Sequence, residues 1–557
     1  MTEPTTLVAV LRYWAAADPD RIAYRLLDER GAETEALSYG DLYLRSMAVA
    51  RQLSRHCPIG ERVLLVLPTS IEFLYGFFGC LLARLVVVPL PVPRPRSVSM
   101  LSSVIADCAP VRILAAASLR ALVASEPELA GLASDTVVTV DELLAADAAD
   151  AGPTYDSIAS MADDIALLQY TSGSTSRPKG VMVSHANIVA NQRMICEAFD
   201  HRGPVTVVAW APLYHDQGLI GNVLQPLFIG GCAVLMPPAA FFRDPILWLE
   251  LIHRYRAHTS GGPNFAFELC VTRYNEARVA PLDLSCWKVA FNGAEPVSAQ
   301  VLRAFSMRYA AHGFSATAHF PCYGLAEATL YVSGGPAHHE PDVLAYPDGS
   351  GEVVSVGTVH REIDVVVIDE LGQKCSEGCV GEICLRGPNV TSGYWNLPAG
   401  GAPHFVTLDV RGPSFLATGD LGFVRDGQLF VTGRKKELII LRGRNIYPYD
   451  IERSIAVSHE GFRPGHCAVF GHVDGSEQRI YAVQEIERTY RGKIDFHEVA
   501  GLVRRKVSQH HGVMLYRIYF VRPGYLPKTT SGKTKRLLLP SLLIETPIDS
   551  DRIYASC

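Results

Sequence analysis

Short runs of β-branched and aliphatic residues alternate with longer segments of helical periodicity along most of the chain. The short runs include RVLLVLP, VRILAAA, VTVVAWAP, CAVLMPP and KVAFNG, and the longer segments include DPILWLELIHRYRA and SAQVLRAFSMRYAA. A helix between two strands carries the chain back to the same end of a sheet, so that the two strands run parallel. The alternation therefore predicts an α/β fold with layered, mostly parallel sheets.

The length and a change of pattern predict more than one domain. A chain of 557 residues exceeds what a single hydrophobic core ordinarily serves. From about 351 to 430 the pattern changes to short strands and turns, which predicts a β-rich subdomain. Strands with one helix follow. We therefore predict a large N-terminal domain of layered α/β subdomains, residues 1–432, and a small α+β C-terminal domain, residues 433–557. The Ala/Asp-rich stretch 125–164 is predicted to be a loose connection.

The sequence does not predict a membrane span or a secreted protein. The most apolar stretch, residues 73–93, contains Arg84 and three prolines, which would interrupt a spanning helix. It is predicted to be a buried helix followed by a buried strand. Arg12 interrupts the apolar run near the N-terminus, which favours an amphipathic helix over a signal peptide. With 13 scattered cysteines, the expected location is the reducing cytoplasm.

The net charge of −6 is unevenly distributed. Residues 434–557 carry 21 Lys and Arg against 13 Asp and Glu, a balance of +8, so the preceding residues carry −14. A small basic part on an acidic body suits anionic ligands or an acidic partner more than nucleic acid. In the helix predicted there, Arg504, Arg505 and Lys506 lie largely off the apolar face. They form either an ordinary solvated surface or a docking face.

The sequence YTSGSTSRPKG, residues 170–180, combines glycine with five hydroxyl side chains and ends in Pro-Lys-Gly. Such a loop can wrap an anion, and a neighbouring lysine suits phosphate. The Walker pattern is not met, because Pro178 stands in place of its second glycine and Gly180 follows Lys179. The later SGKT fails the same test. A Ser/Gly-rich linker is the alternative, but linkers rarely lie between two apolar strands.

Further stretches place polar side chains after apolar runs or in turns. The residues that they offer are His215 and Asp216 in APLYHDQGL, Glu295 in FNGAEPV, Glu327 in PCYGLAEATL, Asp420 in TGDLGF, Arg434 in GRKKELII and Lys533 in LPKTTSGKTKR. Each has an ordinary explanation when taken alone. A carboxylate can cap a turn or begin a helix, and a lysine can lie on the surface.

Together and in this order, these stretches resemble the signature motifs of the adenylate-forming superfamily, which includes acyl-CoA synthetases, adenylation domains and luciferases. Runs such as PLYHDQGLIGNVLQPLFIGG and PCYGLAEATLYVSGG are similar to its fatty acyl-AMP ligase branch, as is Ala326, where the superfamily often has threonine. The resemblance implies an enzyme that uses ATP and Mg²⁺ to convert a fatty acid to acyl-adenylate and pyrophosphate. The acyl group would then pass to the phosphopantetheine thiol of an acyl carrier protein, or of a polyketide or nonribosomal-peptide carrier domain.

The resemblance also assigns roles to residues. The nucleotide would be bound by Thr171, Ser172, Gly173, Ser174, Thr175, Lys179, Gly293, Ala294, Glu295, Tyr323, Gly324, Asp420 and Arg434. Within this set, the hydroxyl loop and Lys179 would hold the β- and γ-phosphates, which compensates the charge of the departing pyrophosphate. Tyr323 would stack on adenine, and Asp420 would accept both ribose hydroxyls. Glu327 would bind Mg²⁺ together with the phosphates of the substrate.

Lys533 is implied to act in the first chemical step. A cation between the carboxylate and the α-phosphate would offset the repulsion of these two anions. His215 would orient or gate the carboxylate, and Lys436 would be the hinge about which a mobile small domain rotates between an adenylating and a thiol-transfer pose. The acyl pocket is expected to be lined by Ile220, Gly221, Val223 and Leu224.

Three alternatives stay open at this point. They are a medium- or long-chain acyl-CoA synthetase, a catalytically silent acyl- or carrier-binding protein, and a P-loop ATPase. The silent protein is disfavoured by the presence of Lys179, Glu327, Asp420 and Lys533. The missing Walker pattern disfavours the ATPase. Fatty acyl-AMP ligases differ from coenzyme A ligases partly by an insertion after the Glu327 motif that restrains the small domain. Residues 333–357 occupy that region.

Overall fold

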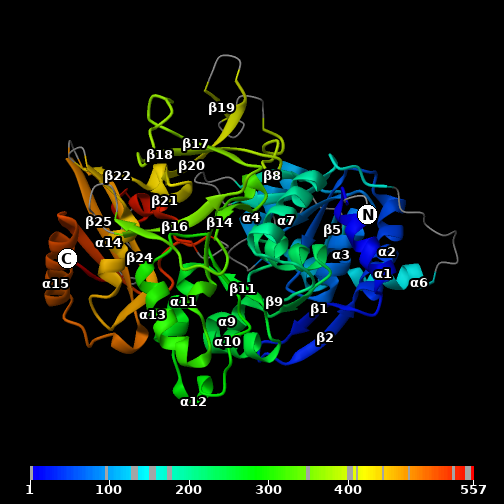
Figure 1. Cartoon of the computed structure of the whole chain (residues 1–557), viewed down its shortest axis with the longest axis horizontal. Helices are drawn as coiled ribbons and strands as arrows, with labels where there is room; N and C mark the ends of the chain where they lie inside the picture. The colour runs from blue at the N-terminus through cyan, green and yellow to red at the C-terminus, as the bar shows by residue number, and fades with distance from the viewer. Residues whose placement is uncertain are drawn as a thin grey trace.

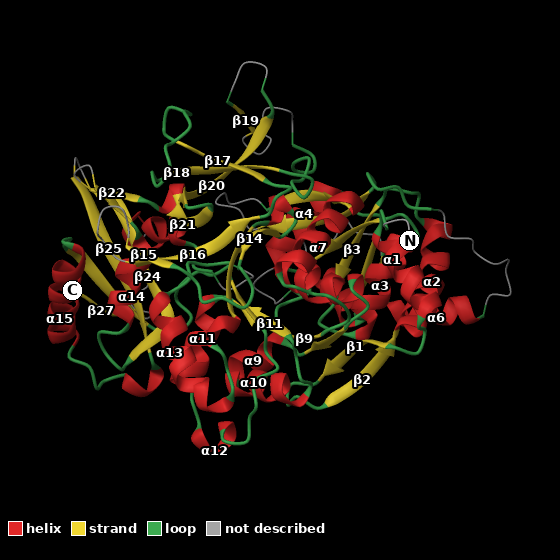
Figure 2. Ribbon diagram, viewed as in Figure 1, coloured by secondary structure: helices red, strands yellow, loops and turns green. Residues whose placement is uncertain are grey.

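The computed structural model arranges the chain as two large sheets covered by helices, with a smaller sheet in the C-terminal part (Figure 1; Figure 2). This is the predicted α/β class of fold. The structure describes residues 4–93, 98–126, 129, 136–149, 159–171, 178–345, 352–397, 405–408, 412–441, 444–474, 477–529, 533–545 and 553–557.

The first sheet has the strand order β6-β5-β3-β4-β7-β8 and is parallel except for its last pair. Its strands are β3 (Arg62–Val66), β4 (Val86–Pro89), β5 (Arg112–Ala115), β6 (Val137–Val138), β7 (Ile165–Thr171) and β8 (Lys179–Ser184). The helices of this region are α1 (Leu7–Ala17), α2 (Tyr39–His56), α3 (Ile71–Leu82), α4 (Val98–Cys108), α5 (Ser118–Ser125) and α6 (Val140–Ala148). The predicted runs RVLLVLP and VRILAAA form the neighbouring strands β3 and β5, which are buried on both faces because helices cover the sheet.

The second sheet is parallel from β13 through β12, β11, β9 and β10 to β1, and β2 is added antiparallel at its edge. These strands are β1 (Ile22–Leu27), β2 (Glu33–Ser38), β9 (Thr206–Ala209), β10 (Cys232–Leu235), β11 (Thr259–Gly262), β12 (Val289–Asn292) and β13 (His319–Gly324). The helices are α7 (His185–Ala198), η2 (Gln217–Leu224), α8 (Gln225–Phe228), α9 (Pro238–Arg243), α10 (Pro245–Arg254), α11 (Asn264–Thr272), α12 (Glu276–Val279) and α13 (Ala299–Tyr309). The two helical patterns singled out in the sequence are α10 and α13.

Antiparallel strands continue the second sheet beyond β13 in the order β14-β16-β21-β20-β18-β17. They are β14 (Tyr331–Gly334), β15 (Val343–Ala345), β16 (Glu352–Val359), β17 (Asp364–Ile368), β18 (Gly381–Arg386), β19 (Phe405–Thr407), β20 (Ser414–Arg425) and β21 (Gln428–Arg434). This part contains the short strands and turns that the sequence indicated. It shares one sheet with the parallel strands and continues that sheet beyond β13 (Figure 1).

The C-terminal part contains the hairpin β22-β23 and the sheet β24-β25-β26-β27. Its elements are β22 (Ile439–Leu441), β23 (Arg444–Ile446), α14 (Pro448–Ala456), β24 (Phe462–Asp474), β25 (Glu477–Ile486), α15 (Phe496–His511), β26 (Leu515–Val521) and β27 (Ile553–Ser556). In Figure 1 this part, coloured orange to red, lies beside α11 and α13. Arg453 donates to Gln300 and Asn264 donates to Tyr449, so hydrogen bonds join it to the N-terminal part.

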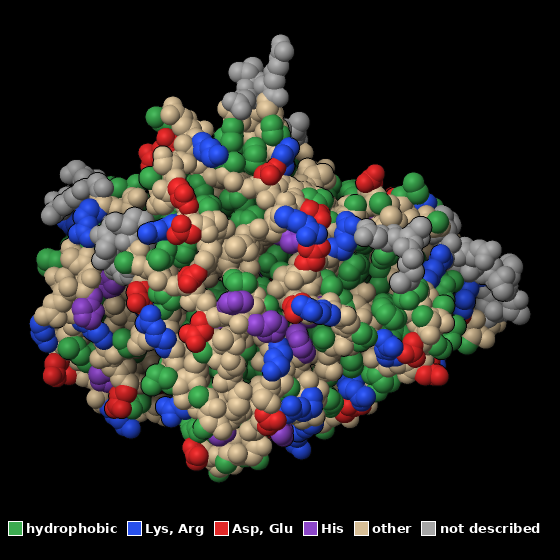
Figure 3. Space-filling model, viewed as in Figure 1, with side chains coloured by type: hydrophobic (Ala, Val, Ile, Leu, Met, Phe, Trp, Pro, Cys, Tyr) green, Lys and Arg blue, Asp and Glu red, His purple; other side chains and the backbone are tan. Residues whose placement is uncertain are grey.

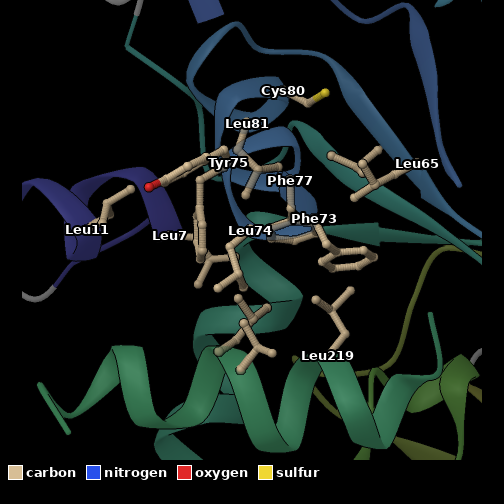
Figure 4. Close-up of a cluster of buried hydrophobic side chains, with 14 of the residues drawn as sticks. Leu7, Leu11, Leu65, Phe73, Leu74, Tyr75, Phe77, Cys80, Leu81 and Leu219 are labelled. Carbon is tan, nitrogen blue, oxygen red and sulfur yellow. The ribbon is translucent and has the colours of Figure 1, made fainter. Parts of the chain in front are cut away.

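The apolar run that begins at Phe73 forms α3, which lies between elements of both sheets. Ser70 caps its first turn, and every residue from Phe73 to Leu82 is buried. Figure 4 shows Phe73 and Leu74 facing Leu219 of η2, with Leu7 of α1 nearby. A helix that is apolar on all sides is buried in the core of a large protein or spans a membrane. Among the helices that the structure describes, none has both the length and the apolar character that a membrane span requires.

The prediction of a loose connection over 125–164 is wrong for part of that stretch, because it contains β6 and α6. Thr139 and Glu142 form a capping box that satisfies amides of the first turn of α6. Arg51 donates to Asp147 at 2.7 Å and fastens α6 to α2. Alanine is the best helix former, so the Ala-rich composition is equally typical of a helix once such a cap is present.

Candidate active site

A cavity of about 2250 Å³ opens where the carboxyl ends of the parallel strands meet the β-rich strands and the C-terminal part. It exceeds the roughly 300–1,000 Å³ that is usual for one small ligand, so there is room for several substrates. Residues that line it at or after the ends of β7, β9, β11, β12 and β13 include Thr171, His215, Asn264, Glu295 and Glu327. Open α/β sheets bind ligands at this edge, because loops there collect side chains from several strands.

The hydroxyl loop leaves one of these strands. Thr171 ends β7 and Lys179 begins β8, and the two residues are paired in antiparallel register. Both line the cavity. The other predicted loop residues, Ser172, Gly173, Ser174 and Thr175, lie outside the described residues. A Cβ atom on Gly180 would lie 2.9 Å from the ring of Tyr170, so glycine is needed for the close approach that holds Lys179 at the mouth of the loop.

The turn after β12 presents the backbone of residues 293–295 to the cavity. Ala294 has a φ of 67°, a left-handed conformation that is uncommon for a non-glycine residue. A Cβ atom on Gly293 would lie 2.8 Å from the carbonyl oxygen of Cys322, so this turn packs directly on β13. Strained turns of this kind are found at ligand clamps. Gly324, at the end of β13, completes this wall.

Tyr323, Asp420 and Arg434 form one connected group. The Tyr323 hydroxyl donates to Asp420 Oδ2 at 2.7 Å, and Arg434 Nε lies 3.0 Å from Asp420 Oδ1. Asp420 and Arg434 face each other across β20 and β21, and the Asp420 side chain is buried. Burial and then Asp420 raise the pKa of Tyr323, so its hydroxyl stays protonated and donates. Each carboxylate oxygen has further lone pairs, so Asp420 can also accept from a ligand.

Lys533 reaches the cavity from the chain between β26 and β27. Its backbone N–H donates to the Thr529 hydroxyl at 3.0 Å, and its carbonyl accepts from the Thr529 N–H at 2.7 Å, so two hydrogen bonds join the two residues. The Lys533 side chain is exposed to the cavity, and the surrounding protein encloses the cavity. This enclosure lowers the pKa of Lys533, and the nearby charge of Arg434 lowers it further. The acidic groups that act in the opposite direction are Asp216, Asp420 and Glu295. A lysine of the C-terminal part thus faces carboxylates of the N-terminal part.

His215 and Asp216 lie in the loop after β9, where the imidazole Nδ1 contacts the Asp216 carboxylate. Asp216 caps η2 by accepting from the Gln217 N–H at 2.6 Å. Burial acts to raise the pKa of Asp216, but His215 and Lys533 outweigh it, so the pKa is lowered and the carboxylate stays charged. A Cβ atom on Gly218 would lie 2.0 Å from the Pro212 carbonyl, so the turn requires glycine.

Of the four residues predicted for the acyl pocket, Gly221 lines the cavity. Ile220, Val223 and Leu224 are 0% exposed and belong to the core behind it, and their role stays a prediction. The apolar side chains that line this branch of the cavity and that the sequence did not indicate are Ile195, Phe199, Phe291, Leu330 and Tyr331. They belong to separate segments around α7, β12 and β14. Phe291, Leu330 and Tyr331 lie within or beside the quoted motifs, but no local pattern assigned them to an acyl pocket.

Lys436 lies at the junction between β21 and the C-terminal part. The residues on either side of Lys436 form ion pairs with different parts of the protein. Lys435 Nζ lies 2.7 Å from Glu382 of β18, whereas Glu437 lies 2.7 Å from Arg536, next to the turn that carries Lys533. This placement suits a hinge, and the hinge role of Lys436 stays a prediction.

Glu295 is expected to make stability depend on pH. Burial raises its pKa to about 7 from the ordinary 4.5, partly offset by the hydrogen bond from the Phe265 N–H. As pH rises, the unfolded chain loses the Glu295 proton at a lower pH than the folded protein does. The contribution of Glu295 to the free energy of unfolding is therefore complete below pH 4.5 and is lost as pH rises through about 7. We expect the melting temperature of both proteins to fall from acidic to alkaline pH. The fall should be about 2–4 °C smaller in Glu295→Gln than in the wild type.

The measurement is a series of thermal melts across this pH range. The exposed Glu340→Gln is the matched control and should follow the wild-type slope. Equal slopes for Glu295→Gln and the wild type would contradict the raised pKa.

A parallel sheet that opens into a cleft, with a lysine supplied by a small C-terminal part, defines a ligand-binding enzyme of the α/β class. The family model described as AMP-binding enzyme matches residues 11–395. The model described as Disco-interacting protein 2-like, AMP domain matches residues 436–542.

Known proteins match over nearly the whole length. The medium-chain-fatty-acid–[acyl-carrier-protein] ligase TtuA of Teredinibacter turnerae is 35% identical, over 98% of this chain and 94% of its own. JamA of Moorena producens, a protein of the same description, is 36% identical over 99% and 97%. A structure from studies of fatty acyl-adenylate ligases from E. coli and L. pneumophila is 33% identical and superposes with a TM-score of 0.83 over 96% of both chains. The chain therefore belongs to the AMP-binding enzymes, in the fatty acyl-AMP ligase branch of the adenylate-forming superfamily, as its motifs predicted.

Proposed function

We propose that this protein activates a fatty acid with ATP to an acyl-adenylate and then transfers the acyl group to the phosphopantetheine thiol of an acyl carrier protein. The observation that carries the proposal is Lys533, which lies in the cavity opposite carboxylates of the N-terminal part. The names of the relatives support a fatty acid substrate and a carrier protein acceptor. A structure of the L. pneumophila ligase, 31% identical with a TM-score of 0.74 over 100% of this chain and 98% of that one, contains acyl adenylate and pyrophosphate.

In the first step, a carboxylate oxygen of the fatty acid attacks the α-phosphorus of ATP. A new P–O bond forms, the bond from the α-phosphorus to the bridging oxygen breaks, and pyrophosphate leaves with the electron pair. Lys533 lies between the two reacting anions and stabilises the charge of the transition state. Lys179 and the hydroxyl loop hold the departing pyrophosphate. Asp420 accepts from the ribose hydroxyls, while Tyr323 and the backbone of residues 293–295 hold the adenine.

Glu327 is the residue that we assign to Mg²⁺. It is a hard oxygen donor that lines the same cavity as Lys179, and although Oε1 accepts a hydrogen bond from Tyr394, the carboxylate keeps lone pairs for a cation. Mg²⁺ usually binds one or two carboxylates together with substrate phosphates, so a single carboxylate fits. When bound, the cation would compensate the charge of the phosphates during attack.

In the second step, the carrier thiol attacks the acyl carbon. A thioester forms, the bond from the acyl carbon to the phosphate oxygen breaks, AMP leaves and the thiol proton passes to solvent. Lys533 occupies the cavity in this structure, so the C-terminal part that follows Lys436 must rotate about this residue to admit the thiol. We propose that the large and the small domain divide at residues 432 and 433. We also propose a cytoplasmic setting, in which the scattered cysteines stay reduced.

The basic C-terminal part suits an acidic carrier protein. On the face visible in Figure 3, basic and acidic side chains are interspersed. Arg504 donates to the carbonyls of Leu515 and Tyr516, and Lys506 donates to that of Val457, so these two side chains also stabilise the fold. Docking at Arg504, Arg505 and Lys506 is therefore tested with Arg505→Glu alone, which should slow carrier loading at low salt. Unchanged carrier loading would contradict docking at this face.

The acceptor is tested by direct competition. Fatty acid, ATP and Mg²⁺ are supplied with either coenzyme A or a phosphopantetheinylated carrier protein, and both thioesters are quantified. We expect loading of the carrier and little acyl-CoA. Comparable rates for both thiols would favour the acyl-CoA synthetase alternative. This test matters because the described part of the segment 333–357 packs on α13 through Val343 and Val354, whereas the resemblance implies a segment that restrains the small domain.

Gly221 should control the length of the accepted acid. Its Cβ position would lie 3.1 Å from Leu330, so a side chain there narrows the apolar branch of the cavity. We expect Gly221→Leu to lower kcat/KM for a long-chain acid roughly tenfold relative to a short-chain acid. The measurement is adenylate formation with acids of increasing length, and Gly203→Leu, where the space is open, is the control. An equal loss for all lengths would contradict the assignment.

A further inference from the structure

Tyr394 lies in the cavity between two residues that the proposed mechanism uses. Its hydroxyl donates to Glu327 Oε1 at 2.6 Å. The ammonium group of Lys179 lies over its ring, 5.0 Å from the centroid. The Tyr394 hydroxyl thus contacts Glu327, the carboxylate that we assign to the cation. The face of the Tyr394 ring contacts Lys179, the lysine that we assign to pyrophosphate.

The backbone holds Tyr394 in this position from two sides. Its segment runs along β8, where Met182 N–H donates to the Gly393 carbonyl at 3.0 Å and Trp395 N–H donates to the Gly180 carbonyl at 2.7 Å. A few residues earlier, Thr391 N–H donates to the Glu327 carbonyl at 2.9 Å. The segment therefore joins the strand that carries Lys179 to the turn that carries Glu327.

The turn of Glu327 is itself held by this segment. Thr329 has a φ of 66°, and its buried hydroxyl donates to the Asn389 carbonyl at 2.7 Å. Asn389 donates in return to the Ala328 and Tyr331 carbonyls. A strained backbone persists only where its surroundings determine it, so the position of Glu327 depends on the segment 389–395.

We propose that Tyr394 is a positioning residue that holds Glu327 and Lys179 side by side without letting them pair, so that the cation and the departing pyrophosphate are bound at one place. Rotation of either side chain into a direct ion pair would neutralise both and leave neither available for a ligand. Tyr394 is neutral and lies between the two charged groups. Its hydroxyl donates to the Glu327 carboxylate, and its ring contacts the Lys179 ammonium. This inference rests on the proposed function, since it uses the roles given there to Glu327 and Lys179.

Two variants separate the two contacts. Tyr394→Phe removes the hydroxyl and keeps the ring, whereas Tyr394→Leu removes both. Mn²⁺ binding in the presence of ATP, without fatty acid, is measured by electron paramagnetic resonance, and pyrophosphate binding without metal is measured by calorimetry. We expect Tyr394→Phe to weaken Mn²⁺ binding roughly tenfold, the usual effect of losing a partner of a metal ligand, and to leave pyrophosphate binding unchanged. Tyr394→Leu should also weaken pyrophosphate binding, by roughly fivefold.

A double variant and a neighbouring control complete the test. Tyr394→Phe should have no further effect on Mn²⁺ binding in a Glu327→Gln protein, because the partner is already altered. Trp395→Phe, in the same segment but stacked on Arg62, should behave as the wild type. Wild-type Mn²⁺ binding by Tyr394→Phe overturns the proposal, even if Tyr394→Leu fails to fold. Failure of the proposed function would appear instead as a wild-type protein that forms no acyl-adenylate while the Mn²⁺ effect persists.

Discussion

Replacement of Lys533 by alanine is expected to slow acyl-adenylate formation by about 10²–10³-fold. The ammonium group lies in a cavity enclosed by protein, where a charge stabilises a transition state more strongly than it does in water. Transfer of the acyl group from a supplied acyl-adenylate should be nearly unchanged, because the α-phosphate bond is already made. The measurements are ATP–pyrophosphate exchange for the first step and carrier loading from synthetic acyl-adenylate for the second.

The control is Lys493→Ala, in the same part of the chain, where the ammonium lies over the Tyr490 ring outside the cavity. It should retain both steps. Lys533→Arg should recover little, because a planar guanidinium cannot replace a compact ammonium between two anions. An equal loss of both steps in Lys533→Ala would contradict a role limited to adenylation.

Replacement of Asp420 by alanine is expected to raise the KM for ATP on the order of 10²-fold, because two charge-assisted hydrogen bonds to the ribose are lost. The same change leaves Tyr323 and Arg434 without their shared partner. The KM for the fatty acid should change far less, since Asp420 lies on the nucleotide side. Initial rates of adenylate formation, measured against each substrate in turn, check this prediction.

Asp426→Asn is the matched control for Asp420. Asp426 lies at the exposed tip of the same hairpin with a φ of 51°, a conformation that asparagine also tolerates. It should leave the KM for ATP unchanged. If Asp420→Ala bound ATP as tightly as the wild type, the assignment of Asp420 to the ribose would be wrong.

The position of Lys533 depends on contacts beyond its own turn. Arg536 forms ion pairs with Glu437, next to the junction, and with Glu452 of α14, both at 2.7 Å. The arginine thereby connects the junction, α14 and the turn of Lys533 into one unit. Rotation at the junction would therefore carry Lys533 out of the cavity together with the rest of the C-terminal part, which is what alternation between two half-reactions requires.

Much of the fold could be predicted from local patterns. Apolar runs predicted strands such as β3, β5, β9, β10 and β12, because their residues are buried on both faces of covered sheets. Helical periodicity predicted α10 and α13. The composition of α6 does not distinguish it from a linker, because Ala and Asp are common in both, whereas the capping box of Thr139 and Glu142 begins a helix there.

Local patterns were sufficient to predict the α/β class and the family, and they named candidate residues in the motif loops, because strand periodicity, glycine turns and short motifs are local properties of the chain. Which side chains meet in the cavity depends on the packing of distant segments. Lys533 faces Asp216, Tyr394 lies between Lys179 and Glu327, and the apolar branch of the cavity is built from separate segments. The physical reason is that these contacts join residues far apart in the chain, and their geometry is set by how sheets and helices pack rather than by any local pattern.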